Sequence, residues 1–279
     1  MHLQRLQLFH FKNHSERSLE FCNGINTITG ANGVGKTNIL DAVHYLANAK
    51  SYFNGIDSQI IEHDASFFTI KGHFEGEAPA DILVQFEGGK KSIKKNDKAY
   101  PRLLDHVGMI QTVFITPYDI ELALGNSDDR RKFVDLSLCQ IDKAYLQNLS
   151  IYKKTLEQRN ALLKLQFENG FFERESIEIW DEQLIRYGTA IHNKRVAFIE
   201  AFIPLFQHYY KWISQEQEAV SLNYESKLTE TDFRTLLQQA YPKDMRVHYT
   251  SVGIHKDDIT FLLEGLPIKR FGSQGQQKS

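Results

Sequence analysis

Residues 30–37 read GANGVGKT, which matches the pattern G-x-x-x-x-G-K-[S/T] at every specified position. Residues 25–29 precede the loop as an apolar strand pattern, and residues 36–47 follow it with apolar side chains at helical spacing. A loop rich in glycine can turn several backbone N–H groups inward, and the following helix adds the positive end of its dipole. This combination predicts a site for the phosphates of a nucleoside triphosphate.

The chemistry of this motif assigns a role to each part of the loop. The backbone surrounds the phosphates, the lysine reaches the β- and γ-phosphates, and the threonine hydroxyl binds Mg²⁺. The expected nucleotide-binding residues are Gly30, Ala31, Asn32, Gly33, Val34, Gly35, Lys36 and Thr37. We therefore expect Mg²⁺ to accompany the nucleotide, with Thr37 as a ligand of the metal ion.

Strand patterns dominate the first 115 residues around this loop. Short apolar runs are separated by turns, and Gly88-Gly89 supplies the positive φ that a tight hairpin needs. The expected strands cover residues 3–11, 19–21, 25–29, 67–74, 81–86, 90–95 and 107–115. Together with the helix over residues 36–47, they predict an α/β domain.

Helical spacing replaces the strand pattern after Pro117. Apolar side chains recur at steps of three and four in residues 142–169 and again in residues 180–205, with a break near Asn169-Gly170. This spacing predicts two long helices packed as an antiparallel pair. An ordinary helical bundle has the same spacing, so the pattern alone does not distinguish the two.

A further helix and two strands are expected near the end of the chain. The helix begins at Thr229, which would form a capping box with Asp232, and ends before Pro242. Strand patterns return at residues 247–252 and 259–263. Strands thus come first, helices are inserted, and strands return.

This order predicts one α/β head domain that is split by an inserted helical lobe. We assign residues 1–115 to the first part of the head, residues 116–244 to the helical lobe, and residues 245–279 to the second part of the head.

Composition excludes several classes of protein. The chain has 33 Lys and Arg against 35 Asp and Glu, a net charge of −2, so it does not bind nucleic acid by bulk charge. Two cysteines are too few for a disulfide scaffold, and no apolar run is long enough for a membrane helix. The histidines show no metal-ligand spacing, so we expect no structural metal. From the missing apolar run and the small number of cysteines, we expect no membrane partner and a cytoplasmic location.

Residues near the end of the chain indicate which class of ATPase the loop belongs to. Residues 273–276 read SQGQ, a form of the S-x-G-Q signature of ABC-type ATPases. In that signature a serine hydroxyl and a glycine amide at a helix N-terminus bind the γ-phosphate of ATP held by a second subunit. The expected residues acting on the partner's site are Ser273, Gln274, Gly275 and Gln276.

Several longer segments are more specific than these two motifs. They are FKNH at 11–14, KSYF at 50–53, RRKFVD at 130–135, LEQRN at 156–160 and GIHKDD at 253–258. With them, the whole chain resembles the RecF family, bacterial DNA replication and repair ATPases of the ABC/SMC superfamily. The resemblance implies an ABC/SMC-type P-loop ATPase head, incomplete in this chain, with an inserted all-helical second lobe.

The resemblance also implies a function. It implies a homodimer, stabilised by ATP, that binds gapped DNA or junctions between single-strand and duplex DNA. There the family acts with RecO and RecR to help RecA replace single-strand-binding protein in recombinational repair and replication restart. ATP hydrolysis would time release from DNA.

One departure from the family concerns hydrolysis. The family continues past the signature into a strand that ends in paired acidic residues, which bind Mg²⁺ and activate water. Asp257-Asp258 precede the expected strand over residues 259–263, so they are no substitute. We therefore expect this chain to be a fragment that binds ATP, lacks catalytic residues of its own, and hydrolyses ATP poorly or not at all.

Two groups of basic residues are candidates for DNA contacts. Lysines cluster on the expected hairpin, although lysines on a hairpin edge also prevent edge-to-edge aggregation. Two arginines follow Ser127, a candidate N-cap, in a first helical turn where the dipole disfavours cations, which suggests an anionic or carboxylate partner. The candidates are Lys90, Lys91, Lys94, Lys95, Arg130 and Arg131.

Other residues have more than one reading. Residues 12–14 could lie near the nucleotide, as in related ATPase heads, and Gln111 is a candidate for the glutamine that senses Mg²⁺ and the γ-phosphate. His255 could face the shared nucleotide site or form a structural turn. Two alternative classes are a small-molecule kinase, which the signature disfavours, and a transporter ATPase subunit, which residues 130–135 and 156–160 do not fit.

Overall fold

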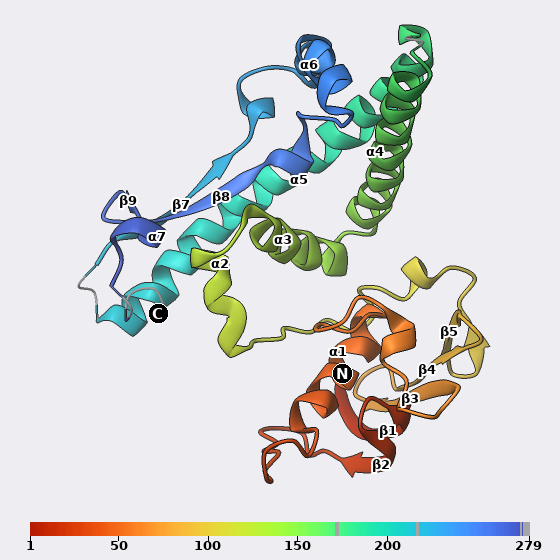
Figure 1. Ribbon diagram of the computed structural model, residues 1–279. Coiled ribbons are helices and arrows are strands. Elements are labelled where there is room, and N and C mark those ends of the chain that lie inside the picture. The colour runs from red at the N-terminus through yellow and green to blue at the C-terminus, as the bar shows by residue number, and fades with distance from the viewer. Residues whose placement is uncertain (171–172, 216–217, 274, 276–279) are drawn as a thin grey trace. The chain divides into compact units, whose positions relative to one another are not determined.

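The computed structural model describes residues 1–170, 173–215, 218–273 and 275 (Figure 1). Helices and strands both occur, so the α/β class is confirmed. The chain divides into two compact units, Met1–Phe114 and Ile115–Ser279. We call them unit 1 and unit 2. Whether residues 245–279 complete the head domain stays a prediction.

Unit 1 contains a six-stranded antiparallel sheet. The strand order is β2-β1-β3-β4-β5-β6, and the turn between β4 and β5 uses Gly88 and Gly89 at φ of 56° and 75°. The expected meander and its glycine turn are therefore present. The strands are β1 (His2–Phe11), β2 (His14–Glu20), β3 (Phe67–Glu75), β4 (Ala80–Glu87), β5 (Lys90–Lys95) and β6 (Lys98–Ala99).

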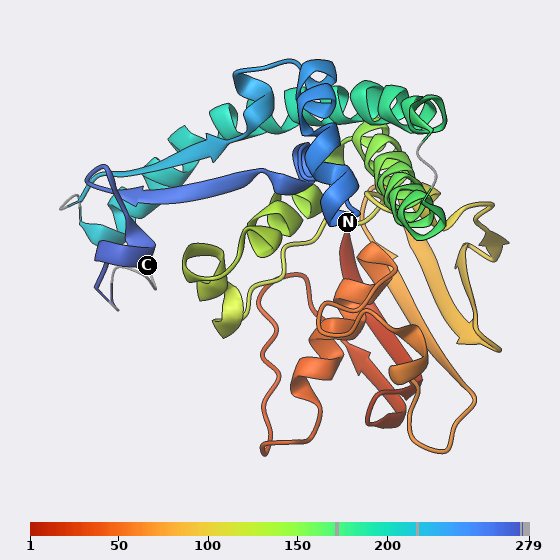
Figure 2. The ribbon, with the colours of Figure 1, turned by 45° about the horizontal axis from the view of Figure 1, so that its top comes forward.

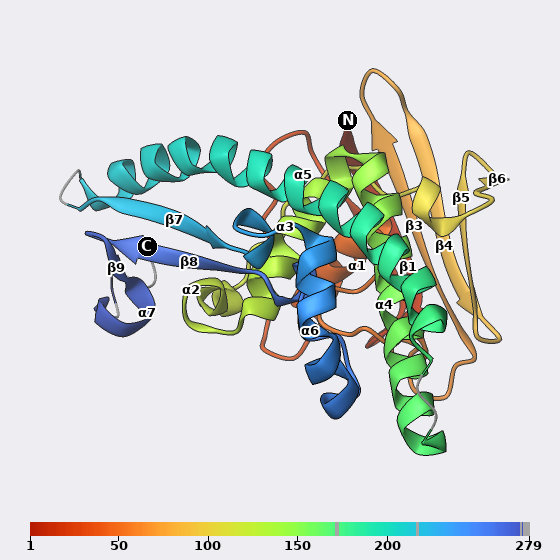
Figure 3. The same ribbon diagram turned by 90° about the horizontal axis from the view of Figure 1, so that it is seen from above.

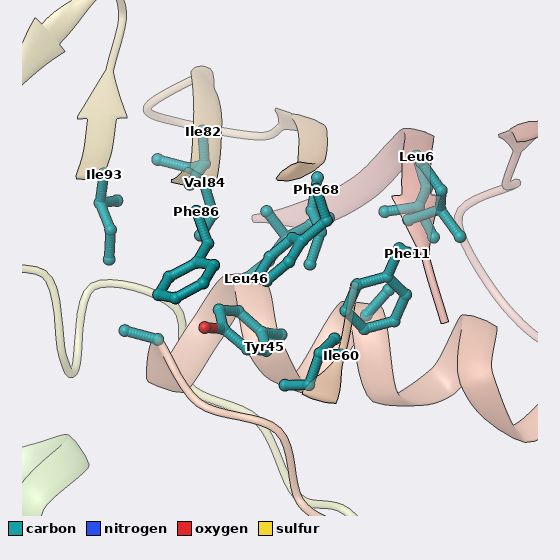
Figure 4. Packing of buried hydrophobic residues seen from close by; sticks show 14 of the residues in the cluster. Leu6, Phe11, Tyr45, Leu46, Ile60, Phe68, Ile82, Val84, Phe86 and Ile93 are labelled. Carbon is teal, nitrogen blue, oxygen red and sulfur yellow. The ribbon is translucent and has the colours of Figure 1, made fainter. Parts of the chain in front are cut away.

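Helix α1 (Lys36–Asn48) packs on one face of this sheet and forms the core of unit 1 (Figure 4). Tyr45 and Leu46 of the helix are fully buried and pack with apolar side chains of the strands, including Phe68 of β3. A Cβ atom at Gly72 would lie 2.6 Å from Leu46 Cδ1, so the glycine of β3 lets the helix approach the sheet closely. Two short turns, η1 (Asp57–Gln59) and η2 (Leu103–Asp105), complete the helical elements that the structure describes in unit 1.

Two expected strands of this region are wrong. Residues 25–29 and residues 107–115 have no regular structure, although both carry the apolar pattern of a strand. A strand needs a hydrogen-bonded neighbour, and within the described residues no strand pairs with either segment. Some of their apolar side chains are consequently exposed, Ile25 by 94% and Val113 by 86%, whereas Ile28 and Ile110 pack against the core of unit 1 without strand pairing.

Unit 2 is mostly helical. A three-stranded antiparallel sheet of order β7-β8-β9 lies beside the helices, formed by β7 (Val220–Glu225), β8 (Asp258–Leu263) and β9 (Leu266–Pro267). The longer helices are α3 (Ser127–Ile141), α4 (Lys143–Asn169), α5 (Arg174–Ser214) and α6 (Phe233–Val247). The short ones are η3 (Pro117–Ile120), α2 (Glu121–Leu124), η4 (Lys227–Thr229), η5 (Ile254–Lys256) and α7 (Ile268–Phe271).

The antiparallel pair of long helices is present as α4 and α5 (Figure 3). Helix α4 ends at Gly170, which adopts the left-handed conformation at φ 63°, as the predicted break requires. Buried arginines hold the pair together. Arg159 of α4 lies 2.6 Å from Asp181 of α5 and 2.8 Å from Asp244 of α6.

A second buried arginine joins more distant segments of unit 2. Arg195 of α5 lies 2.9 Å from Asp135 of α3 and 3.3 Å from Asp257, which precedes β8. It also donates to the carbonyl oxygen of Ile254 at 2.8 Å. Burial alone would lower the pKa of this arginine, but the surrounding acceptors, Asp135 first, raise it far above its usual value. The guanidinium therefore stays charged and fixes α3, α5 and the start of β8 together.

Three predictions in unit 2 are wrong in detail. Helix α6 begins after Asp232, not at Thr229, because Asp232 is itself the N-cap and accepts from the Thr235 N–H at 3.0 Å. The helix continues through Pro242 to Val247, and residues 248–252 form no strand. Strand β7 was not expected.

Candidate nucleotide-binding site

The loop of residues 30–35 leads directly into the first turn of α1, in the red-orange part of the ribbon (Figure 2). Gly30, Gly33 and Gly35 have φ of 150°, 85° and 92°, values that L side chains rarely adopt. Gly35 is the N-cap of the helix, and the first turn of α1 carries no acidic residue. The N-terminal N–H groups of α1 and the positive end of its dipole therefore face the loop without a competing carboxylate.

The side chain of Lys36 is folded back over the loop. Its Nζ donates hydrogen bonds to the carbonyl oxygens of Gly30 at 2.9 Å and Ala31 at 2.8 Å. These two carbonyl oxygens, which are neutral acceptors, hold the ammonium group at the loop. Phosphate oxygens carry charge and bind an ammonium more strongly than neutral carbonyls do.

Thr37 follows Lys36 on the exposed side of α1. Among the described residues, its hydroxyl has no hydrogen-bond partner and can therefore serve as a ligand for Mg²⁺. The donor type fits this ion, which prefers oxygen ligands. Elsewhere in the described part of the chain, no group of three or more His, Cys, Asp or Glu residues could hold a metal ion.

The turn between β1 and β2 supports the loop through side-chain hydrogen bonds to its carbonyl oxygens. Asn13 donates to the carbonyl oxygen of Gly33 at 3.4 Å, and Nε2 of the buried His14 lies 3.2 Å from the carbonyl oxygen of Gly35. Because a carbonyl only accepts, His14 donates through Nε2. Asn38 of α1 in turn donates to Asn13 at 2.7 Å. The residues expected near the nucleotide therefore include two that contact the loop itself, and Asn38 is a third that the sequence did not single out.

Lys12 has a different partner. Its Nζ lies 2.6 Å from Asp41 Oδ2, and Asp41 is fully buried in α1. The same carboxylate accepts from the Ser51 hydroxyl at 2.6 Å and from the Tyr52 N–H at 2.7 Å. Lys12 thus anchors the segment that follows α1, and among the described residues it forms no hydrogen bond or ion pair with the phosphate loop.

Gln111 lies in the segment without regular structure and is exposed. Three residues later, Phe114 packs against Tyr52, with ring centroids 4.7 Å apart, and against His44 of α1 at 5.4 Å. These contacts fix the end of the segment on unit 1. Among the described residues Gln111 forms no hydrogen bond, so its role as a sensor of Mg²⁺ stays a prediction.

The lysines of β5 divide between the two faces of the sheet, because side chains alternate along a strand. Lys90 and Lys94 are paired with Glu87 and Leu83 of β4, on the face away from the core. Lys91 points to the helix-covered face, where its Nζ lies 2.7 Å from Asp57 and 2.7 Å from the carbonyl oxygen of Ala49.

Lys95 also belongs to the inner face, opposite the buried Ile82. Burial lowers the pKa of His106, and the charge of Lys95 acts in the same direction. The four lysines therefore do not form one cluster on a single face: the side chain of Lys91 is 14% exposed and paired with Asp57, and Lys95 lies on the same inner face. Their role as DNA contacts stays a prediction.

Arg130 and Arg131 have internal partners. Arg130 is buried and forms two hydrogen bonds with the carboxylate of Asp258, at 2.7 and 3.0 Å. Arg131 donates to the carbonyl oxygen of Asp257 at 2.5 Å and pairs with Asp128. The expected carboxylate partner is thus present, and it lies within unit 2. Both guanidinium groups are occupied by protein acceptors, which favours a structural role, and their role as DNA contacts stays a prediction.

The acidic pair serves structural purposes as well. Asp258 begins β8, and although burial alone would raise its pKa, Arg130 lowers it below the usual value. Asp257 is buried, and burial raises its pKa. It accepts from the Tyr224 hydroxyl at 2.5 Å in addition to its contact with Arg195.

His255 forms a structural turn. Its Nδ1 lies 2.9 Å from the Tyr152 hydroxyl, and its Nε2 lies 2.9 Å from the carbonyl oxygen of Thr250. Because the carbonyl accepts, Nε2 carries the proton and Nδ1 accepts from Tyr152. Burial lowers the pKa of His255 to about 4, so the ring is neutral at pH 7.

The signature segment follows α7 at the end of unit 2. Ser273 and Gly275 are exposed, whereas Gln274 and Gln276 lie outside the described residues. No helix in the described part of the chain is long and apolar enough to cross a membrane.

Comparison with known proteins gives consistent results over the whole chain. A family described as an AAA domain matches residues 5–240. The DNA replication and repair protein RecF of Flavobacterium johnsoniae is 46% identical over 281 residues, which cover 100% of this chain and 78% of that protein.

Two solved structures are also similar. They are structures of the recombination mediator protein RecF in the RecFOR pathway, one with ATP and one with ATPrS. Their TM-scores are 0.91 and 0.93, at 30% and 29% identity. In both cases the match covers 99% of this chain and 77% of the solved chain.

Proposed function

The chain belongs to the RecF family of DNA replication and repair proteins, and we propose that it binds ATP at residues 30–37 and uses the nucleotide to control its association with DNA. The observation that carries this proposal is the preformed loop. Three glycines at positive φ, a helix N-terminus free of acidic residues and the ammonium of Lys36 are assembled at one place.

Nucleotide binding would exchange the partners of Lys36. The ammonium leaves the carbonyl oxygens of Gly30 and Ala31 and binds oxygens of the β- and γ-phosphates, which are charged acceptors. The loop N–H groups then donate to the remaining phosphate oxygens. Asn13 and His14 hold the carbonyls of Gly33 and Gly35 in place, so the loop pays little ordering entropy on binding.

Mg²⁺ would be held by the hydroxyl of Thr37, with Gln111 as a second protein ligand. When bound, the ion neutralises charge on the β- and γ-phosphates. Thr37 is exposed and has no partner among the described residues, so no protein hydrogen bond has to break.

The same proposal includes a homodimer stabilised by ATP. Ser273 and Gly275, with Gln274 and Gln276, would bind the γ-phosphate held by the P-loop of a second copy. The exposure of Ser273 and Gly275 leaves them accessible to such a partner. A solved relative is a RecF–ATP structure, which supports an ATP-bound form of this chain.

The proposed substrate is gapped DNA or a junction between single-strand and duplex DNA. RecO and RecR are the proposed protein partners, and assistance to RecA loading is the proposed outcome. Family membership supports these assignments. Lys90 and Lys94, on the outward face of β5, remain candidates for DNA contacts in unit 1.

Fluorescence anisotropy of a labelled gapped duplex tests the proposal. The protein is titrated with ATP, with ADP and without nucleotide at fixed salt, and Lys36→Ala is measured in parallel. We expect the tightest binding with ATP, and loss of that preference in the variant. Loss of a charge-assisted contact weakens ATP binding by about 1.5–3 kcal/mol, or roughly 10- to 100-fold. Equal DNA affinity in all three nucleotide states would contradict a nucleotide-controlled function.

A further inference from the structure

Helix α4 carries exposed lysines that form no ion pair with the described residues. Residues 143–156 contain three lysines and no Asp or Glu. The side chains of Lys143, Lys153 and Lys154 are exposed, and among the described residues none forms an ion pair with them. Each therefore presents a full positive charge to solvent.

Two of these lysines, Lys143 and Lys154, share the outward side of the helix. Residues 145, 149 and 152 are buried toward α5, and the opposite side of the helix is formed by residues 143, 147, 150 and 154. Lys153 borders that side. At ~1.5 Å of rise per residue, Lys143 and Lys154 are roughly 16 Å apart along the helix, a length over which duplex DNA presents several phosphates.

The neighbouring polar side chains are uncharged. Gln147 and Gln158 are exposed on the same side of α4, and amides can donate hydrogen bonds to phosphate oxygens. Asp142, the acid nearest to Lys143, is neutralised by Lys194 at 2.8 Å. Glu157 lies one turn beyond Lys153 and Lys154 and marks the end of the acid-free section.

The other exposed surfaces of the helix pair differ from this one. Along α5, the exposed carboxylates Glu175, Glu178, Glu182 and Glu200 interrupt any basic surface. Later in α4, Lys164 is paired with Glu168 at 3.8 Å. Among the described residues of the two helices, exposed lysines without an ion pair are therefore grouped in the first half of α4, with Lys211 alone near the end of α5.

We propose that the outward side of α4, formed by Lys143, Lys153 and Lys154 with Gln147 and Gln158, binds the phosphate backbone of DNA. This inference rests on the proposed DNA-binding function and names the surface that performs it in unit 2. The contacts are electrostatic and independent of sequence, because lysine side chains on one helix side reach phosphates without reading base edges.

The test is the salt dependence of DNA affinity in three proteins. They are the unaltered chain, the triple variant Lys143→Gln, Lys153→Gln, Lys154→Gln, and the matched control Lys164→Gln. Each is titrated with a labelled gapped duplex in the presence of ATP at a series of salt concentrations. Thermal unfolding and ATP affinity are measured alongside and are expected to be unchanged, because all four lysines are exposed.

Each lost phosphate contact lowers the slope of log K against log salt by about 0.9. We expect the magnitude of this slope to be smaller by roughly 2 to 3 in the triple variant, and its DNA affinity near 0.1 M salt to be at least about tenfold lower. The control is expected to have the slope and the affinity of the unaltered chain. A triple variant with the slope of the unaltered chain would overturn the surface while leaving the DNA-binding function in place. Absence of DNA binding by the unaltered chain at every salt concentration would overturn that function and the surface with it.

Discussion

Asn38, in the first turn of α1, donates a 2.7 Å hydrogen bond to the side chain of Asn13, which lies between β1 and β2. Through its own amide group Asn13 reaches the carbonyl oxygen of Gly33. One side chain thus connects the sheet, the phosphate loop and the helix that follows it. The loop is therefore held in shape by a residue outside the motif itself.

Asn13→Ala is expected to weaken ATP binding more than it lowers stability. The substitution removes both hydrogen bonds, each worth about 0.5–1.5 kcal/mol, and releases the loop. We expect a roughly 5- to 50-fold rise in the Kd for ATP, measured by calorimetry. Gln158→Ala, which removes an exposed amide of unit 2, serves as the control. Equal ATP affinities in the two variants would contradict a supporting role for Asn13.

Gly35→Ala is expected to be more damaging than Gly33→Ala. Both glycines have φ near 90°, so both variants incur backbone strain of about 1–3 kcal/mol. A Cβ atom at position 33 meets open space, whereas one at position 35 would lie 2.6 Å from His14 Nε2. Urea denaturation should show an additional loss of about 1–3 kcal/mol for Gly35→Ala. Equal stability of the two variants would mean that the turn moves aside without cost.

Gly188→Ala tests the packing of α5 against α6. A Cβ atom there would lie 2.5 Å from Phe233 Cε1 and 3.0 Å from Tyr152 Cε2. Alanine favours a helix over glycine by about 1 kcal/mol, but overpacking costs about 1–3 kcal/mol, so we expect a net loss of stability. Combining Gly188→Ala with Phe233→Leu should cost less than the sum of the two single losses. Strict additivity would argue against a direct clash.

His255 makes stability depend on pH. Its pKa is about 4 in the folded chain, below the ordinary 6.5, because burial disfavours the charged ring. As pH falls from 6.5 toward 4, the unfolded chain binds the proton first, so the free energy of unfolding falls by up to about 1.4 kcal/mol per pH unit. Above pH 6.5 the contribution is constant.

Urea denaturation at pH 7 and pH 5 measures this effect. His255→Gln should reduce the loss between the two pH values by up to about 2 kcal/mol. His63→Gln, which alters a fully solvated ring, should leave the loss as it is. An unchanged loss in His255→Gln would assign the acid sensitivity to other buried groups, among them His192, whose pKa burial also lowers.

Local signals were sufficient for the elements that depend on neighbouring residues. The loop of residues 30–37, helix α1 and the hairpin at Gly88-Gly89 are encoded within short segments, and all three are present. The alternation of the β5 lysines could also have been read from that hairpin, because the turn places Lys90 opposite Glu87 and so assigns every second lysine to the inner face.

Long-range partners could not be predicted in the same way. Nothing near Asp41 in the sequence shows that its carboxylate binds Lys12 and the segment after α1. Residues 25–29 and 107–115 carry the apolar pattern of a strand, but a strand forms only where another strand supplies hydrogen bonds. Pattern alone does not contain that information.

The ion pair between Arg130 and Asp258 joins residues 128 positions apart. During synthesis at ~5–20 residues per second, the carboxylate is translated roughly 6 to 25 seconds after the guanidinium that it neutralises. Likewise, Asp257 is translated 62 positions after its partner Arg195. Until β8 leaves the ribosome, the helices of unit 2 would bury arginines without their full complement of acceptors, which is costly. The nascent helical segment is therefore expected to remain undocked, and a substrate for chaperones, until nearly the whole of unit 2 has been made.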